Sequence, residues 1–500
     1  MKIVIKVALI ALLWITAINK GSLNGDTLLR LKMTHAWWTG TEEVAPNYQP
    51  KLRGDLEAGV IGVGGKRYLA YDVGQSMLML PGDWLGTQLH RWFPKFKEID
   101  FRALVVNFAI FVPLNVAAVV SFFWLLRLFE FNERIAGLTS VTLLLSTTVF
   151  HYAQVHQHNN QLLLFVTLGY ATALACVLQS RPRFAILSGL ALGAAMLLRA
   201  SSIIHVLTVF LFLVGCIVYQ SRDKFKVFQV VGWWIVGFIP LALLARIFDY
   251  IRYGSFWTSG QSLSVKQLTT DPIWSGFPEF PANYPWIHPP QVGIWGVLLS
   301  PAKSIFIYDP LLLPCLVLGI VFWQKLSPYI QWYLISGIFN LGLHIIITSR
   351  LDFWHGDSAW GARYHVTSVH LLLIPLIALF IQRMLLVRGL TQSLMGGFLI
   401  LAIMVQMTSV ILRPSAETGL VYFPTPQNHM NFRLGDRVVN IACLINTSFS
   451  EQCANKLDNI NRVSLPPMRF QKSRKLAFVL WGLVLAIVIF TTVRFYLAAY

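Results

Sequence analysis

The sequence predicts an all-α polytopic membrane protein, a bundle of about 11–12 transmembrane helices with outer loops and interfacial helices. Hydrophobic residues make up 56% of the 500 residues and charged residues only 12%, and the mean hydropathy is +0.60. Apolar runs of about 16 to 25 residues recur along the chain, which is long enough to cross a hydrocarbon layer as helices. A soluble fold of this length would need far more polar surface.

The apolar runs predict twelve spans. They are residues 3–18, 102–126, 135–150, 160–178, 184–199, 202–219, 227–247, 306–323, 329–348, 365–382, 391–411 and 476–498. The first span has a basic flank like a signal peptide, but its exit at residues 16–19 is a poor small-residue cleavage site, so we expect it to be retained. Residues 75–92 are apolar but contain Pro81, Gly82 and Asp83, which predicts a helix lying at the interface rather than crossing.

Basic residues orient the predicted bundle. The short loops that carry them are placed inside by the positive-inside rule, and their residues are Arg127, Arg134, Arg181, Arg183, Arg222, Lys224, Lys226, Lys325, Arg383 and Arg388. Both chain ends are then inside, and the long segments 19–101, 248–305, 349–364 and 412–475 are outside. Four basic residues at 469–475 depart from the rule, which long translocated loops tolerate. We therefore expect the chemistry at the outer face.

The net charge of +18 does not indicate nucleic-acid binding, because the basic residues are spread among loops that flank apolar spans. Their excess on the outer side suits a phosphate-bearing lipid substrate. Cys443 and Cys453 are the only cysteines in a polar segment, where they either close a disulfide in an oxidising compartment or remain two free thiols.

The predicted spans contain almost no ionisable groups at their centres. Coupled transporters usually place such groups at mid-membrane, where they mark ion or proton paths. The two halves also lack an obvious repeat of broken helices. These features favour an enzyme over a transporter.

Two early segments carry candidate chemistry. Asp26 follows the first span, where it either caps a helix that starts at Thr27 or acts as a base. Residues 65–76 form a basic, aromatic strand or turn that leads into the interfacial helix. Tyr71 and Gln75 in it are candidate ligands for a sugar, although tyrosines here also suit interface anchors.

Two later segments complete the set. Lys303 lies in a Ser-Pro-Ala-Lys-Ser turn where an ammonium and backbone N–H groups can face a phosphate. Residues 350–365 combine two histidines, two carboxylates and two arginines with Trp354 and Trp360. An interfacial aromatic belt explains the tryptophans but not this concentration of charge.

Together these segments resemble the GT-C superfamily of membrane glycosyltransferases, which take a sugar from a polyprenyl-phosphate carrier. The likeness is nearest to bacterial members akin to protein mannosyltransferases of glycosyltransferase family 39. It rests on Asp26 in the first outer loop, a Tyr-x-x-Tyr-x-x-Gly-Gln-Ser element ending at Ser76, a Gly-Val-Leu-Leu-Ser-Pro-Ala-Lys turn ending at Lys303 and a Trp-Gly-x-Arg-Tyr element starting at Trp360. Many relatives carry two acidic residues after the first helix, whereas this chain has one.

The resemblance implies inverting transfer from a polyprenyl-phosphate-linked sugar to an acceptor hydroxyl on a glycan, lipid or protein. Asp26 is the expected base. The residues expected at the donor phosphate are Lys303, Arg363, Arg199 and His355, and those expected at the sugar or acceptor are Tyr71, Gln75, Trp354, Asp357 and Trp360. No cofactor is expected. A divalent metal at His355, Asp357 and His365 is a less favoured alternative.

The predicted organisation is a GT-C-like module over residues 1–411, an outer polar segment over 412–475 and a last span over 476–500. The protein is expected in the bacterial inner membrane, with lipids around it and its site on the outer side. The alternatives are an O-antigen or polysaccharide ligase or polymerase, which would centre on arginine and histidine in one large outer loop, and a lipid-linked sugar transporter.

Overall fold

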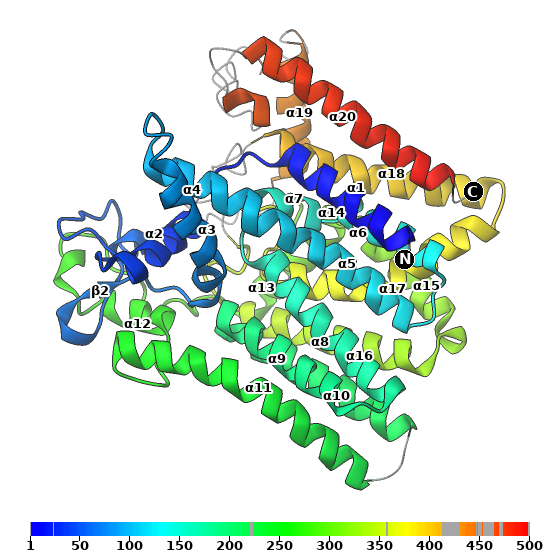
Figure 1. The fold of residues 1–500 in the computed structure, drawn as a ribbon, viewed down its shortest axis with the longest axis horizontal. Helices are drawn as coiled ribbons and strands as arrows, with labels where there is room; N and C mark the ends of the chain where they lie inside the picture. Colours follow the sequence, from blue (N-terminus) through cyan, green and yellow to red (C-terminus); the bar gives the residue numbers. More distant parts are fainter. Residues whose placement is uncertain are drawn as a thin grey trace. The chain divides into compact units, whose positions relative to one another are not determined.

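The structure is a computed structural model that describes residues 2–23, 25–220, 224–356, 359–412, 431–446, 448, 453, 465–469 and 474–498. In these residues the chain is helical apart from one two-stranded sheet (Figure 1). It divides into two compact units. Unit 1 comprises Met1–Lys20, Asn115–Val155 and His288–Tyr500, and unit 2 comprises Gly21–Leu114 and His156–Ile287.

Unit 2 begins with a loop-rich region and continues into four long helices. Its α-helices are α2 (Asp26–Thr39), α3 (Gly74–His90), α4 (Glu98–Val106), α8 (Asn159–Gln179), α9 (Pro182–Leu198), α10 (Ile203–Gln220), α11 (Lys224–Tyr253) and α12 (Gly260–Gln267). Its shorter helical turns are η1 (Leu56–Ala58), η2 (Val63–Gly65), the π-helical η3 (Asn107–Phe111), η4 (Ala200–Ser202) and η5 (Pro272–Trp274). The antiparallel strands β1 (Val60–Ile61) and β2 (Arg67–Tyr68) confirm the short strand predicted before α3.

Unit 1 contains the first and last helices of the chain. Its helices are α1 (Lys2–Ile18), most of α5 (Val112–Leu128), α6 (Glu133–Ser146), α7 (Val149–Val155), α13 (Pro290–Leu299), α14 (Ile305–Tyr308), α15 (Leu312–Val321), η6 (Trp323–Lys325), α16 (Pro328–Thr348), α17 (Val366–Leu386), α18 (Leu390–Ile411), α19 (Arg433–Ile445), η10 (Pro466–Arg469) and α20 (Arg474–Leu497). Helix α1 packs against α6 and α20.

Helix lengths make this a multi-pass membrane protein. Eight helices of the described residues are long and apolar enough to span a membrane, or nine if the bent pair α6 and α7 counts as one span. Ten of the twelve predicted spans are each covered by a continuous helix to within a residue or two of the predicted bounds, whereas those predicted at 135–150 and 306–323 are interrupted. Helices α1 and α9 have 17 residues each, which is at the lower limit for a transmembrane helix of roughly 17–25 residues.

Two predicted spans are broken, and residues at the two breaks are hydrogen-bonded to each other. The chain bends by 62° between α6 and α7, and the span predicted at 306–323 is interrupted between α14 and α15. Asp309 lies at the second break and Thr148 at the first. The buried Asp309 carboxylate accepts hydrogen bonds from the Thr148 backbone N–H at 2.8 Å and from the Thr148 hydroxyl at 3.1 Å. A backbone N–H freed inside a hydrocarbon layer needs such an internal partner.

Helix α3 covers nearly all of the helix predicted at residues 75–92 and continues through Pro81. Pro81 lies seven residues into the helix, and the buried Asp83 beyond it pairs with Arg102 of α4 at 3.0 Å. Asp83 also accepts a hydrogen bond from the Trp38 indole at 2.8 Å. The helix predicted at 75–92 is thus confirmed, and it packs against its neighbours α2 and α4.

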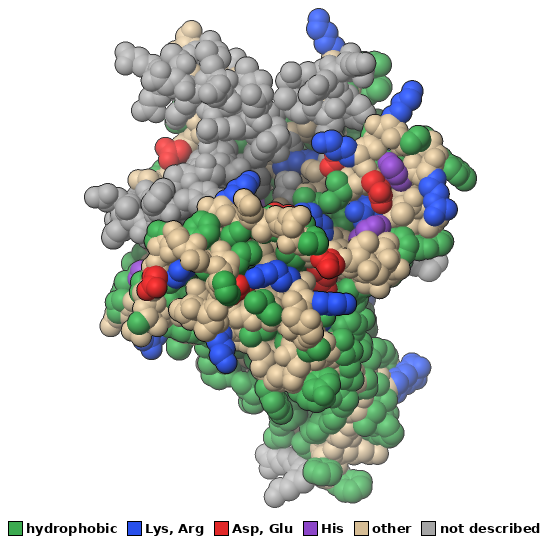
Figure 2. All heavy atoms as spheres, turned by 90° about the vertical axis from the view of Figure 1, so that its left-hand side faces the viewer, with side chains coloured by type: hydrophobic (Ala, Val, Ile, Leu, Met, Phe, Trp, Pro, Cys, Tyr) green, Lys and Arg blue, Asp and Glu red, His purple; other side chains and the backbone are tan. Residues whose placement is uncertain are grey.

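The long helices of unit 2 pack closely and expose apolar side chains. Helices α9 and α11 lie side by side (Figure 1), and Phe228, Val236 and Ile239 of α11 are exposed. Figure 2 shows charged side chains mainly over the loop-rich part of the viewed face, with hydrophobic side chains over its lower part. Such an apolar surface is what a lipid-facing helix presents.

Glycines allow the close contact between α9 and α11. A Cβ atom at Gly237 would lie 2.0 Å from the carbonyl oxygen of Ile186, and one at Gly189 would lie 2.0 Å from that of Trp234. Small residues at such positions let helix backbones approach each other in membrane proteins. A side chain there must displace backbone rather than a flexible neighbour.

We predict that Gly237→Ala destabilises the protein by roughly 1–3 kcal/mol, the usual cost of overpacking. Gly232 of the same helix is the matched control, because a Cβ there meets nothing within 4 Å. Thermal unfolding in detergent measures both variants. Equal midpoint temperatures for Gly237→Ala and Gly232→Ala would contradict the packing.

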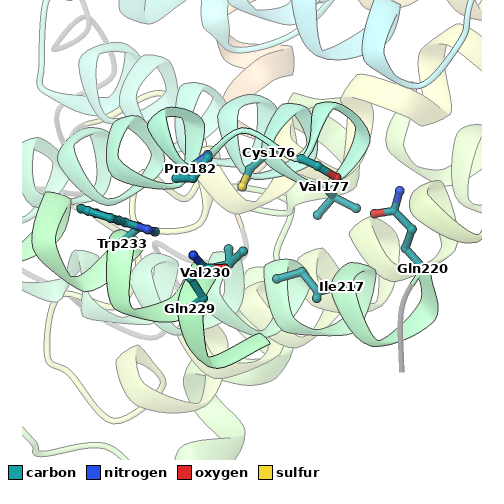
Figure 3. A pocket seen from close by; sticks show the side chains of 9 residues that line it. Cys176, Val177, Pro182, Ile217, Gln220, Gln229, Val230 and Trp233 are labelled. Atoms are coloured by element: carbon teal, nitrogen blue, oxygen red, sulfur yellow. The ribbon is translucent and has the colours of Figure 1, made fainter. Parts of the chain in front are cut away.

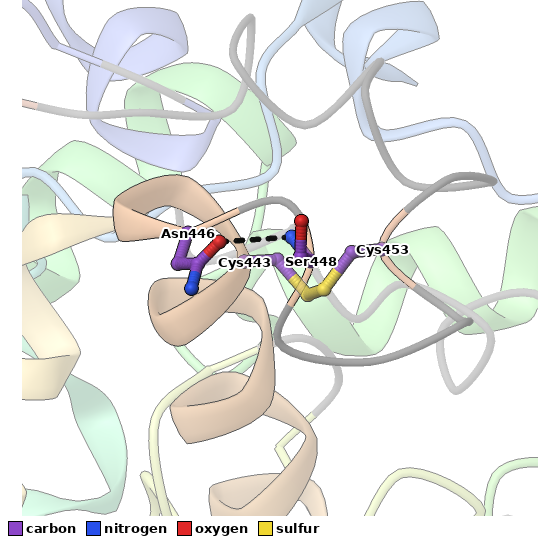
Figure 4. The surroundings of a disulfide bond; sticks show 4 residues. All are labelled: Cys443, Asn446, Ser448 and Cys453. Atoms are coloured by element: carbon purple, nitrogen blue, oxygen red, sulfur yellow. Dashed lines mark hydrogen bonds between the residues drawn. A yellow bond between two sulfur atoms is a disulfide. The ribbon is translucent and has the colours of Figure 1, made fainter.

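The cysteine pair in the polar segment forms a disulfide. Cys443 at the end of α19 is bonded to Cys453, which resolves the two alternatives left by the sequence (Figure 4). Between them the Ser448 backbone N–H donates to the Asn446 side chain at 3.0 Å. Cys176, Cys216 and Cys315 are buried and not disulfide-bonded.

Thiol counting tests this pairing. The chain has five cysteines, so the unfolded protein is expected to react with three maleimides before reduction and with five after it. The Cys443→Ser/Cys453→Ser variant serves as the control and reacts with three in both conditions. Five adducts on the unreduced wild-type chain, counted by intact-protein mass spectrometry, would exclude the disulfide.

Candidate functional site

Helix α2 presents the first predicted site residue. Gly25 is the N-cap and adopts a positive φ of 51°, which favours glycine, and Asp26 is the first helical residue. Asp26 is therefore not the N-cap residue, and no side chain caps this helix. Its carboxylate still lies at the helix N-terminus, where the helix dipole stabilises negative charge.

Asp26 contacts a second predicted site residue, Tyr71. The Tyr71 phenol donates a hydrogen bond of 3.0 Å to Asp26 Oδ1. Tyr71 is buried, whereas Asp26 is half-buried. The two residues are 45 positions apart in the sequence, and the structure joins them through the start of α2 and the segment between β2 and α3.

A buried ion pair fixes the backbone that carries Tyr71. Arg252 near the end of α11 donates to the Tyr71 carbonyl at 3.0 Å and to the Glu43 carboxylate at 3.0 Å. Glu43 also accepts from the Leu69 backbone N–H at 2.8 Å. Both charged side chains are almost fully buried, so each needs the other to offset its lost hydration. Tyr71 is thus held by its main chain as well as by its hydroxyl.

Asp72 lies next to Tyr71 and faces the end of α9. Its carboxylate accepts a hydrogen bond of 3.2 Å from the Ala200 backbone N–H. Burial raises the pKa of Asp72 above its usual range, although the Ala200 hydrogen bond and the positive charges of Arg30 and Arg199 partly oppose this shift. Arg199, a predicted phosphate ligand, therefore belongs to the same electrostatic cluster as Asp72.

Gln75 has a different environment. It is fully buried, and its amide nitrogen donates to the His156 carbonyl oxygen at 2.9 Å. The Thr27 hydroxyl donates to the same oxygen at 3.1 Å. The role of Gln75 in sugar binding stays a prediction. The hydrogen bonds of Thr27 and Gln75 join α2 and α3 to the segment just before α8.

Lys303 of unit 1 is fully buried in the predicted turn between α13 and α14. Its ammonium donates to the carbonyl oxygens of Ala359 at 2.8 Å and Gly361 at 3.4 Å. This contact brings together the Ser-Pro-Ala-Lys turn and the Trp-Gly-x-Arg-Tyr element, two of the motifs that carry the family resemblance. Gly296 of the first motif packs against the Trp354 ring, which would lie 2.1 Å from a Cβ at that position.

Helix α19 adds two buried arginines that sequence reasoning missed. Arg433 donates to the Ala359 carbonyl at 3.0 Å, the same oxygen that Lys303 contacts. Arg437, one turn later, lies over the Trp360 ring at 4.6 Å. The two arginines are four residues apart in an amphipathic helix, and this spacing is the sequence signal that could have indicated a common face. The basic, buried face of α19 thus belongs to the surroundings of the 359–361 turn.

The remaining predicted residues of unit 1 lie in the same segment. His355 is buried with its ring edge-on to Trp354. Arg363 is half-buried and donates to the Tyr364 hydroxyl at 3.2 Å. Asp357 lies outside the described residues, and within those residues no group of three or more His, Cys, Asp or Glu side chains has the spacing of a metal site.

A small cavity lies at the far end of the helices of unit 2 (Figure 3). It is lined by Cys176, Val177, Ser180, Pro182, Ile217, Gln220, Gln229, Val230 and Trp233. Pro182 starts α9 and Arg199 follows its end. At 1.5 Å per residue the helix separates them by about 25 Å, so this cavity is remote from Asp72 and Arg199.

No protein-family model and no curated protein matches the chain. Among solved structures the chain is similar to ArnT from Cupriavidus metallidurans bound to undecaprenyl phosphate. The TM-score is 0.44 at 13% identity, over 81% of this chain and 69% of that one.

The raised pKa of Asp72 predicts a pH dependence of stability. Burial favours the protonated carboxyl in the folded state, so folding stability is greatest below the unfolded pKa and falls as pH rises through the folded pKa. Each pH unit between the two values costs about 1.4 kcal/mol. We expect Asp72→Asn to flatten this fall as pH rises from the ordinary Asp pKa of about 4.

The measurement is the midpoint temperature in detergent as the pH is raised from about 4. Asp100→Asn is the control, because Asp100 is an exposed carboxylate of the same unit. Its pH profile should follow the wild type. Parallel profiles for wild type and Asp72→Asn would refute the assignment.

Proposed function

We propose that the chain is a GT-C-type membrane glycosyltransferase. It moves a sugar from a polyprenyl-phosphate donor to an acceptor hydroxyl on a cell-surface glycan, lipid or protein, at the outer face of the bacterial inner membrane. The observation that carries this proposal is the hydrogen bond from Tyr71 to Asp26. It joins the acidic residue after the first helix to the tyrosine of the Tyr-x-x-Tyr-x-x-Gly-Gln-Ser element, both of which the family pattern contains.

Asp26 is the proposed general base. Its carboxylate takes the proton of the acceptor hydroxyl, whose oxygen attacks the anomeric carbon while the bond to the phosphate oxygen breaks on the opposite face. The bonding electrons leave with the lipid phosphate, and the configuration inverts. A base in this position contributes roughly 100- to 10,000-fold to the rate. The hydrogen bond from Tyr71 to Oδ1 orients the Asp26 carboxylate.

The leaving phosphate needs positive charge, because negative charge grows on its oxygens as the bond breaks. Lys303 and Arg363 are the first candidates, followed by Arg199 and His355. The ammonium of Lys303 bonds to the 359–361 turn, which lies just before Arg363 in the sequence, so the two first candidates belong to one region of unit 1. Trp354, Trp360 and Asp357 remain the proposed sugar or acceptor ligands.

A lipid-linked sugar transporter is the second candidate, and one observation favours it. His370 of α17 is fully buried, and its Nε2 lies 2.9 Å from the Thr148 hydroxyl, which donates to Asp309. Ionisable groups inside a predicted membrane bundle are hypotheses for transport paths. The enzyme is favoured because these groups bond to one another at the two helix breaks, where backbone needs partners.

Replacing Asp26 by Asn tests the proposed base. The amide keeps the shape and can still accept the Tyr71 hydrogen bond, but it cannot take a proton at neutral pH. We expect transfer to fall by roughly 100- to 10,000-fold, with unchanged protein level and unchanged thermal stability. The measurement is mass spectrometry of surface glycans and lipid-linked sugars from a deletion strain that carries each variant.

Asp100→Asn is the matched control, since it neutralises an exposed carboxylate of the same unit, and it should restore the wild-type glycan. Near-normal product from Asp26→Asn would exclude Asp26 as the base. A deletion strain that accumulates lipid-linked polysaccharide, instead of a lipid-linked monosaccharide, would indicate a ligase or polymerase.

A further inference from the structure

Arg30 lies one turn after Asp26 in α2 and was not among the predicted site residues. Its side chain is only 4% exposed, and its guanidinium carbon lies 4.3 Å from the centre of the Tyr71 ring. Tyr71 in turn donates to Asp26. Side chains four residues apart on a helix have Cβ atoms about 5–6 Å apart. The carboxylate, the phenol and the guanidinium therefore form one cluster.

Arg30 differs from other buried arginines of the same unit, because among the described residues it is paired with no carboxylate. Arg102 is paired with Asp83 at 3.0 Å, and Arg252 is paired with Glu43 at 3.0 Å. The Nε and Nη1 atoms of Arg30 are buried and have no hydrogen-bond partner among the described residues, whereas in Arg102 and Arg252 only Nε lacks one. Burying a charged group without such partners costs free energy that the fold must offset. An anion that accepts from these N–H groups removes the cost.

The carboxylates around Arg30 already have other partners, so its N–H groups remain for an anionic ligand. Asp72 and Arg199 belong to the same electrostatic cluster, and Arg246 faces it while paired with Asp249 at 2.9 Å. The Asp72 carboxylate already accepts from the Ala200 N–H. Guanidinium groups bind phosphate oxygens through several N–H donors at once. The first turn of α2, with its dipole, adds further attraction for an anion.

We propose that Arg30 binds the phosphate group of the polyprenyl-phosphate carrier, next to the Asp26 carboxylate. The proposal rests on the function proposed above and adds a phosphate ligand from the helix that carries the base. In this proposed arrangement the phosphate at Arg30 and the acceptor oxygen at Asp26 lie on opposite sides of the reacting sugar carbon, as inverting transfer requires. The phosphate would displace no ion pair, because Arg30 donates to none of the described carboxylates.

The test measures binding without requiring turnover. The full chain in detergent is titrated with farnesyl phosphate, farnesol and inorganic phosphate, and the rise in midpoint temperature reports affinity, because a ligand that binds the folded state stabilises it. We expect farnesyl phosphate to bind and farnesol not to. Arg30→Gln should weaken farnesyl phosphate by about tenfold or more, and Arg30→Lys, which keeps the charge but loses the planar donors, should weaken it less.

Lys32→Gln is the matched control on α2, where Lys32 pairs with Glu57 on the partly exposed face, and it should bind as the wild type does. Midpoint temperatures without ligand show whether each variant folds. If Arg30→Gln fails to fold, Arg30→Lys decides, and wild-type affinity in that variant overturns the proposal.

The outcomes separate this proposal from the proposed function. Asp26→Asn should retain farnesyl phosphate binding, because the base does not hold the phosphate. Wild-type affinity in Arg30→Gln overturns the role of Arg30 and leaves a polyprenyl-phosphate enzyme intact. No binding of farnesyl phosphate by the wild type overturns both. Equal stabilisation by inorganic phosphate and farnesyl phosphate excludes the lipid carrier as the source of the anion.

Discussion

The hydrogen bond between Tyr71 and Asp26 is the interaction on which the candidate site of unit 2 depends. It ties the N-terminus of α2 to the segment before α3. That segment is fixed in turn by Arg252, whose buried guanidinium contacts the Tyr71 carbonyl and the Glu43 carboxylate. The half-buried carboxylate of Asp26 is thus oriented by the neutral phenol of Tyr71. The charged groups that fix the backbone of Tyr71 are Arg252 and Glu43. The Tyr71 hydrogen bond orients the proposed base without itself placing a fixed positive charge on Oδ1.

Burial of charge also organises unit 1, by a different route. The ammonium of Lys303 and the guanidinium of Arg433 meet at the Ala359 carbonyl, and Arg437 covers the Trp360 ring. Three cations from two distant segments thus surround one short turn. The same principle acts within the helices, where Asp309 supplies the acceptor for the freed Thr148 N–H. In each case a polar group that has lost water keeps a defined partner.

Much of the fold was predictable because hydrophobic runs are a direct consequence of the membrane. Ten of the twelve predicted spans are continuous helices, the strand before α3 is present, and the turn at Lys303 occurs where the sequence places it. The errors came from residues whose effect is tertiary. The breaks at Thr148 and Asp309 were not predicted, because they depend on partners 161 residues apart.

The sequence by itself determined the class of protein, the order of its helices and the candidate residue Asp26, because composition and hydrophobic period are local properties. Only the tertiary structure decided that Tyr71 is the partner of Asp26, that Arg30 is buried beside them and that Cys443 is bonded to Cys453. Contacts between residues far apart in the chain depend on how helices pack, and a single sequence does not encode them in any short-range pattern. The buried nitrogens of Arg30 that lack a partner among the described residues are a property of that packing alone.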